Sequence, residues 1–191
     1  MVCFIITFLH FCNLMKDRIS NIITSRRLSL TKRQFVLHYF FVLFFPLIII
    51  VSVQAFIHYN GFGKDEVQGL KTSTLKFVSY SALAIAIAQY MNLKMTEKLC
   101  DLTTTQFDEI CELLVKEMHW CVEAKGENYI ICTTPAKWYN WGTLITIVKN
   151  DDVVLFNSIC DLHNRPSLTA FGQNARNYRA LHQAFSEQLP D

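Results

Sequence analysis

A short stretch near the C-terminus gathers the side chains of this chain that could do chemistry. Residues 160–165 read CDLHNR, with Cys160, Asp161, His163 and Arg165 within six positions. A catalytic cysteine needs a nearby base or a positive environment to form its thiolate. Cys160 is therefore the candidate nucleophile, with His163 as its base and Asp161 in support.

The spacing within this stretch fits known chemical sites poorly. A phosphatase-type loop needs five residues between Cys and Arg, whereas four separate Cys160 from Arg165 and no glycine-rich cradle follows. Cys160 and His163 are spaced like two ligands of one zinc ion, which needs three or four protein ligands. His119 and Cys121 could supply the others, but no spacing requires it. We assign no catalytic residue and no metal ligand, and we expect no cofactor.

A structural explanation accounts for most of the same residues. The run VVLFNSI before Cys160 is typical of a strand, and Asp161, Asn164 and Pro166 favour a turn. Asn174 is a suitable N-cap for a closing helix over residues 175–188. We therefore expect a corner between a strand and a helix, in which Arg165 binds a group of the turn or contacts a partner.

The elements that position this corner belong to a predicted α+β domain over residues 95–191. One apolar stripe at helical spacing predicts a helix within 103–120, capped by Thr105 with Asp108. Its members are Phe107, Ile110, Cys111, Leu114 and Met118. Four strand-like runs follow as two hairpins, with turns at KGEN and KNDD. The order helix, four or five antiparallel strands, helix predicts a sheet with its helices on one face. Between the hairpins, Trp138 and Trp141 are packed aromatics or interaction residues.

Two apolar segments precede this domain and predict a transmembrane helical hairpin. Residues 35–59 carry no charge over 25 positions, and residues 77–93 carry none over 17. About 20 apolar residues span the hydrocarbon core of a bilayer. We expect two transmembrane helices joined by a short non-cytoplasmic loop at 60–76. Alanines four apart in the second helix would let it pack closely on the first helix or on another copy.

Charge gives the expected orientation of this hairpin. The basic N-terminal segment 1–34 has six Lys and Arg against one Asp, whereas residues 97–191 have eight bases and thirteen acids. Positive flanks face the cytoplasm, so we expect a multi-pass cell-membrane protein with both termini cytoplasmic. Translation could start at Met15, since residues 1–14 resemble neither a span nor a signal peptide. The membrane-orienting residues of this prediction are Arg26, Arg27, Lys32 and Arg33.

The run NSICDLHNRPSLTAFGQNARN, residues 157–177, is similar to the end of small uncharacterised bacterial membrane proteins with two transmembrane helices and a C-terminal cytoplasmic domain. That resemblance implies a recurring architecture and no particular activity. We expect the lipid bilayer and a protein partner, or a second copy, as partners, and the acidic domain argues against nucleic acid. A protein-interaction or assembly module is favoured over two alternatives: a membrane-tethered enzyme using Cys160, or a component of an oligomeric channel or transporter.

Overall fold

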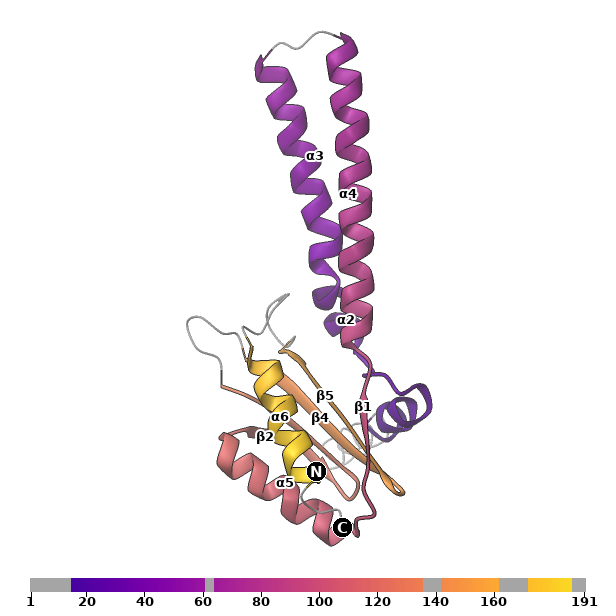
Figure 1. The fold of residues 1–191 in the computed structure, drawn as a ribbon, viewed down its shortest axis with the longest axis vertical. Coiled ribbons are helices and arrows are strands. Elements are labelled where there is room, and N and C mark those ends of the chain that lie inside the picture. Colours follow the sequence, from indigo (N-terminus) through magenta and orange to yellow (C-terminus); the bar gives the residue numbers. More distant parts are fainter. Residues whose placement is uncertain (1–14, 61–63, 136–141, 162–171, 187–191) are drawn as a thin grey trace, which may run out of the picture.

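The protein consists of a sheet-based body from which a long helical hairpin projects (Figure 1). The computed structural model describes residues 15–60, 64–135, 142–161 and 172–186. A helix over residues 15–25 comes first within these ranges. It is followed by α2 (Lys32–His38), α3 (Phe40–Asn60), α4 (Lys64–Asn92), β1 (Thr96–Leu99), α5 (Thr104–Met118), β2 (Cys121–Gly126), β3 (Tyr129–Thr133), β4 (Thr143–Asn150), β5 (Val153–Cys160) and α6 (Gln173–Ser186).

The strands form one antiparallel sheet in the order β1-β5-β4-β3-β2. The four strands and two hairpins expected from the sequence are present, and their turns fall at 127–128 and 151–152, within the predicted KGEN and KNDD. The fifth strand is β1, which the sequence did not indicate. It pairs with β5, with Thr96 opposite Phe156. Since TEKL is short and polar, it has none of the apolar run that marks the central strands.

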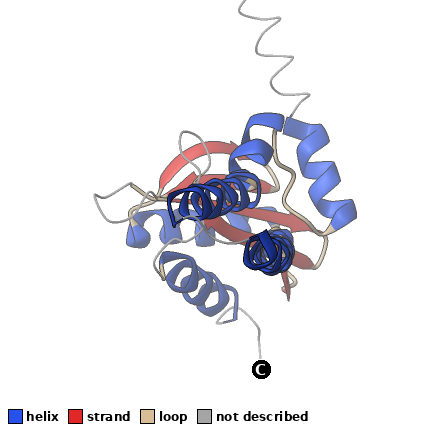
Figure 2. Ribbon diagram, turned by 90° about the horizontal axis from the view of Figure 1, so that it is seen from above, coloured by secondary structure: helices blue, strands red, loops and turns tan. Residues whose placement is uncertain are grey.

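Helices cover both faces of the sheet, whereas one face was predicted. On the first face, α5 and α6 pack on inward-facing side chains such as Ile145, Ile147 and Phe156. On the second face, the helix of residues 15–25 packs on Leu144, Val148 and others. Viewed along the hairpin, that helix and α6 lie on opposite sides of the strands (Figure 2). Because both faces of the sheet are covered, six of the eight residues of β4 and seven of the eight residues of β5 are buried.

The helix ends differ from the predicted ones by one or two residues. Thr103, and not Thr105, caps α5. The Thr103 hydroxyl accepts a hydrogen bond from the backbone N–H of Gln106, and the Gln106 side chain accepts one from the backbone N–H of Thr103. The predicted stripe of α5 is confirmed, with Phe107, Ile110, Cys111 and Leu114 buried. Asn174 is not the cap of α6, because that helix already begins at Gln173. Its side chain instead serves the site described below.

The membrane prediction is contradicted by the helices themselves. Within the ranges that the structure describes, no helix combines the length and the apolar content that crossing a bilayer requires. The charge-free segment 35–59 is divided, since α2 ends at His38 and α3 begins at Phe40. The segment 77–93 is only the end of the longer α4, which also contains Lys71 and Lys76. The prediction of two transmembrane helices is therefore wrong, and so is that of a multi-pass cell-membrane protein with both termini cytoplasmic.

Two of the four basic residues assigned to membrane orientation, Arg26 and Arg27, make contacts within the protein. Arg26 adopts a left-handed conformation with φ of 54° and lies 3.7 Å from the Glu97 carboxylate. The Arg27 guanidinium lies 3.7 Å from the centroid of the Tyr90 ring and donates to the Tyr90 carbonyl at 2.8 Å. Lys32 and Arg33 are exposed in the first turn of α2. Arg26 and Arg27 thus fasten the N-terminal segment to the end of α4 and to β1.

Buried polar groups fix the base of the hairpin. His38, at the end of α2, is buried, and its Nε2 lies 3.0 Å from the carbonyl oxygen of Gln89 in α4. Burial lowers the pKa of His38, and the hydrogen bond to the Gln89 backbone opposes this effect. A neutral imidazole therefore donates to that carbonyl, which holds α2 against α4.

Candidate functional site

The predicted reactive corner is only partly within the described residues. Cys160 is the last residue of β5, opposite Thr143, and is 7% exposed. Asp161 continues the ladder, since its N–H donates to the Gly142 carbonyl at 3.1 Å. His163, Arg165, Trp138 and Trp141 lie outside the described residues. A cysteine so buried is poorly placed to meet a substrate, so its packing role in the strand explains it better than catalysis.

The sheet register separates the cysteines of the zinc hypothesis. Cys121 lies opposite Thr133, Thr133 opposite Leu144, and Leu144 opposite Ile159, the neighbour of Cys160. Three strand spacings of about 4.8 Å put Cys121 and Cys160 about 14 Å apart. Two ligands of one zinc ion each lie about 2.3 Å from it. Cys121 and Cys160 therefore cannot bind the same ion.

Next to this corner, the structure builds a buried network of hydroxyl and amide groups between the sheet and α6. Asn177, fully buried in α6, donates through Nδ2 to Ser158 Oγ at 2.9 Å and to Thr143 Oγ1 at 2.8 Å. Ser158 Oγ in turn donates to Asn174 Oδ1 at 3.1 Å. The Thr143 hydroxyl also lies 3.1 Å from that of Thr134. Such a network holds each of its members in one orientation.

Tyr178 extends the network toward solvent. Its hydroxyl oxygen accepts from the Ser158 backbone N–H at 3.3 Å, and it is hydrogen-bonded to the Thr96 side chain. Burial raises the pKa of Tyr178, while the hydrogen bonds to Ser158 and Thr96 oppose the rise. The phenol is therefore neutral at physiological pH and links β5 with the edge strand β1.

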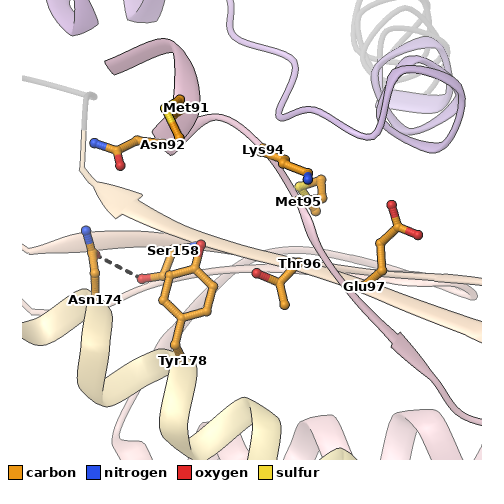
Figure 3. Close-up of a pocket in the computed structure, with 9 residues that line it drawn as sticks. All are labelled: Met91, Asn92, Lys94, Met95, Thr96, Glu97, Ser158, Asn174 and Tyr178. Carbon is orange, nitrogen blue, oxygen red and sulfur yellow. Dashed lines mark hydrogen bonds between the residues drawn. The ribbon is translucent and has the colours of Figure 1, made fainter. Parts of the chain in front are cut away.

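A pocket of about 540 Å³ opens above this network, where the end of α4 meets β1, β5 and the start of α6 (Figure 3). Three lengths of chain that are distant in sequence contribute its walls. The lining residues are Met91, Asn92, Lys94, Met95, Thr96, Glu97, Ser158, Asn174 and Tyr178. None of them was singled out as a site residue by sequence reasoning, because hydroxyl and amide side chains on separate elements leave no motif.

The second candidate site is the apolar surface of the hairpin formed by α3 and α4. The side chains of α3 that face α4 are half-buried and recur at helical spacing. They are Val42, Pro46, Ile49, Val53 and Ile57. Most other described positions of α3 are also apolar, but they are exposed. The exposed apolar side chains on the two helices, here called the hairpin surface, are Phe44, Phe45, Leu47, Ile48, Ile50, Val51, Phe56 and Tyr59 in α3 and Leu75, Phe77, Tyr80, Leu83, Ile87, Tyr90 and Met91 in α4.

The alanines of α4 divide between the two sides of that helix. Ala82 and Ala86 are half-buried on the side facing α3, together with the buried Val78. Ala84 and Ala88 are exposed on another side of the helix. One pair thus serves the intramolecular contact expected from the sequence, and the other pair lies beside Leu83 and Ile87 of the hairpin surface.

Comparison of the chain with protein-family models, with curated proteins and with solved structures finds no match. The resemblance of residues 157–177 to small two-span bacterial proteins therefore stays an expectation from the sequence. The function is argued below from the two candidate sites alone.

Proposed function

We propose that this protein is an assembly module whose hairpin binds the hairpin of a second copy, so that two hairpins form a four-helix bundle. The observation that carries the proposal is the one-sided covering of α3. This helix has no charged residue along its 21 positions, yet only the face toward α4 is covered among its described side chains. A helix that is apolar all round is normally buried on all sides.

The size of the hairpin surface supports a stable interface. The large side chains that form it are between 37% and 90% exposed. At roughly 100 Å² for a half-exposed aromatic or large aliphatic side chain, the surface is on the order of 1,500 Å². The largest apolar patch of a typical monomer is about 300–600 Å², and a standard interface needs about 800 Å² from each partner. The hairpin surface exceeds both values.

The shape of this surface favours a second copy over a compact partner. With a rise of 1.5 Å per residue, α3 is about 31 Å long, and its exposed apolar side chains extend over most of that length. A partner must offer a matching apolar surface of equal length, which the same hairpin in a second chain does. The exposed Ala84 and Ala88 allow a close approach of helix backbones at the centre of such a bundle.

The test compares two lysine substitutions on the hairpin with a single lysine substitution on the body. Leu83 in α4 is 58% exposed and Leu113 in α5 is 64% exposed, so neither replacement disturbs a core. We expect the unmodified chain to be dimeric by native mass spectrometry and by light scattering after gel filtration. Leu83→Lys, combined with Ile87→Lys, should give a monomer, because it puts buried charges at the interface. Leu113→Lys should stay dimeric.

Two results would overturn the proposal. One is a folded, unmodified chain that stays monomeric at every concentration tested. The other is a monomer that floats with phosphatidylcholine vesicles, since lipid and not a second copy would then cover the hairpin surface. Circular dichroism of each variant shows that the helices persist, so that loss of assembly is separated from unfolding.

A further inference from the structure

The end of α4 is held by hydrogen bonds from several other parts of the chain. The last carbonyls of a helix have no partner within the helix, and here donors from α2, from residues 27–28 and from β5 fill these positions. The pairs of carbonyl and donor are Gln89 with His38 Nε2, Tyr90 with Arg27, Leu93 with the Leu28 N–H, and both Asn92 and Lys94 with Asn157 Nδ2, at 2.7–3.0 Å. These bonds, here called the α4 clamp, fix the direction in which the hairpin leaves the body (Figure 1).

One donor of the α4 clamp can change its charge near neutral pH. Arginine stays protonated, and amide and backbone N–H groups do not titrate, whereas the ordinary pKa of histidine is 6.5. His38 is 5% exposed and gives its Nε2 hydrogen to the Gln89 carbonyl at 3.0 Å. That single acceptor suits the neutral imidazole, which has one N–H. A protonated ring would bring a second N–H and a charge into the same buried place.

The groups around His38 do not compensate such a charge. The Tyr39 ring meets the His38 ring edge-on, with 5.0 Å between their centroids. On α4, the ring of Tyr90 is covered by the Arg27 guanidinium, which is itself a cation. The sequence of α3 has no charged residue, α2 adds only bases, and within the described ranges no carboxylate forms an ion pair with His38. Burial accordingly lowers the pKa of His38, and the hydrogen bond to the Gln89 carbonyl opposes this only in part.

The helix that His38 fixes is short and adjoins a break between two helices. The seven residues of α2 are fewer than an isolated helix needs in water. A capping box of Thr31 and Gln34 holds its start, and His38 is its last residue. Tyr39 belongs to neither helix, because α3 begins at Phe40. Loss of the contact between His38 and α4 would therefore free the end of α2 and allow the chain to bend at Tyr39.

We propose that His38 is a pH-sensitive switch at the base of the hairpin. With a neutral imidazole it holds α2 against α4, and with a protonated imidazole it lets the two helices separate. In the open form His38 is in water and takes up a proton near its ordinary pKa of 6.5, whereas the closed form resists protonation. The closed form is therefore fully stable above about pH 7.5 and loses stability as the pH falls through about 6.5. This inference does not depend on assembly, because neither His38 nor Gln89 belongs to the hairpin surface.

Hydrogen exchange of the α2 amides tests the switch, measured by mass spectrometry at about pH 7.5 and about pH 5 and corrected for the intrinsic rates. In the unmodified chain we expect the protection of α2 to fall about tenfold. The fall should not exceed about thirtyfold, which is the limit that an ordinary pKa of 6.5 sets at about pH 5. The amides of α5, which packs on the sheet away from the hairpin base, should lose less than about twofold. His38→Gln keeps a donor for the Gln89 carbonyl and cannot be charged, so its α2 protection should be equal at both pH values.

His58→Gln is the matched control, because His58 is exposed in α3 and takes no part in the α4 clamp. It should show the same fall as the unmodified chain. Unchanged α2 protection in the unmodified chain would overturn the proposal, as would a fall that persists in His38→Gln or an equal fall in α5. If His38→Gln does not fold, an NMR titration of the two histidine rings in the unmodified chain decides the question. His38 should titrate at lower pH than His58, and a midpoint at or above that of His58 would overturn the proposal.

Discussion

Single buried residues decide how the sheet and α6 fit together, and Asn177 is the clearest case. Its side chain is fully buried and links Ser158 of β5 with Thr143 of β4. Gln173 Nε2 in turn donates to Asn177 Oδ1 at 3.1 Å, so both ends of the amide are used. The hydrogen bonds of Asn177, a polar residue on the apolar side of α6, therefore fix the position of this helix on the sheet.

Asn177→Leu should destabilise the protein by about 2–3 kcal/mol, because two buried hydroxyl groups lose a donor and the cost of each is about 1 kcal/mol or more. The free energy of unfolding from urea denaturation followed by circular dichroism measures this. Arg176→Ala, on the exposed side of the same helix, should change it by less than about 0.5 kcal/mol. Equal effects of the two substitutions would contradict the role given to the network.

The cysteines among the described residues behave mostly as small apolar residues, and their thiols differ in exposure. Burial raises the pKa of Cys132 to about 12 and raises that of Cys111 as well. Cys121, in contrast, is exposed on the edge strand β2. The sequence predicted this packing role for Cys111 from its place on the helical stripe, because the spacing of apolar residues is set by helix geometry.

A pH and labelling experiment tests the buried thiols. In the folded protein at pH 8, a thiol reagent should modify Cys121 and spare Cys111 and Cys132, which should react only after unfolding. Since the folded pKa of Cys132 exceeds its ordinary value of 9.0, the unfolded chain loses this proton first. Stability should therefore be full below about pH 9 and fall as pH rises toward 12. Mass spectrometry of labelled peptides and urea titrations across this range measure both effects.

At the scale of elements, the sequence correctly predicted the features that depend on residues close together in the chain. The stripe of α5, the two β-hairpins and the apolar face of α6 follow from side-chain periodicity and turn residues. The strand β1 could not be predicted in the same way, since its four residues are mostly polar and its pairing with β5 is a tertiary contact. The pocket was missed for a related reason, because Lys94, Ser158 and Asn174 meet only after the chain has folded.

The cap of α5 lies two residues before the predicted one, and the sequence contains the signal that distinguishes the two positions. Three threonines in succession, at 103–105, all suit a helix start, and only Thr103 has the glutamine three positions later that completes a capping box. Thr103→Ala should cost about 1 kcal/mol of stability. Thr105→Ala is the matched control inside the first turn and should be nearly neutral. Thermal or urea unfolding measures both, and a larger loss for Thr105→Ala would move the cap to the predicted position.

At the scale of the whole molecule, the N-terminal segment is part of the body. The sequence suggested only a basic stretch that orients the chain in a membrane. In the structure Ile19 and Ile22 are buried against the second face of the sheet. The backbone of this segment also pairs with the end of α4, since Leu28 N donates to the Leu93 carbonyl at 2.7 Å and Met95 N to that of Arg26 at 2.9 Å. Charge alone could not reveal this, because the sheet it covers lies about 100 residues further along the chain.

This placement predicts that the helix of residues 15–25 and the sheet unfold together. Ile22 is 2% exposed, so Ile22→Ala leaves a cavity between that helix and the sheet and should cost about 2–4 kcal/mol. Asn21→Ala, at the exposed neighbouring position, should change stability by less than about 0.5 kcal/mol. Urea unfolding should show one transition for both variants, shifted to lower denaturant for Ile22→Ala. If Ile22→Ala left the free energy of unfolding unchanged, the helix would not belong to the core. Another segment would then have to pack on the second face of the sheet.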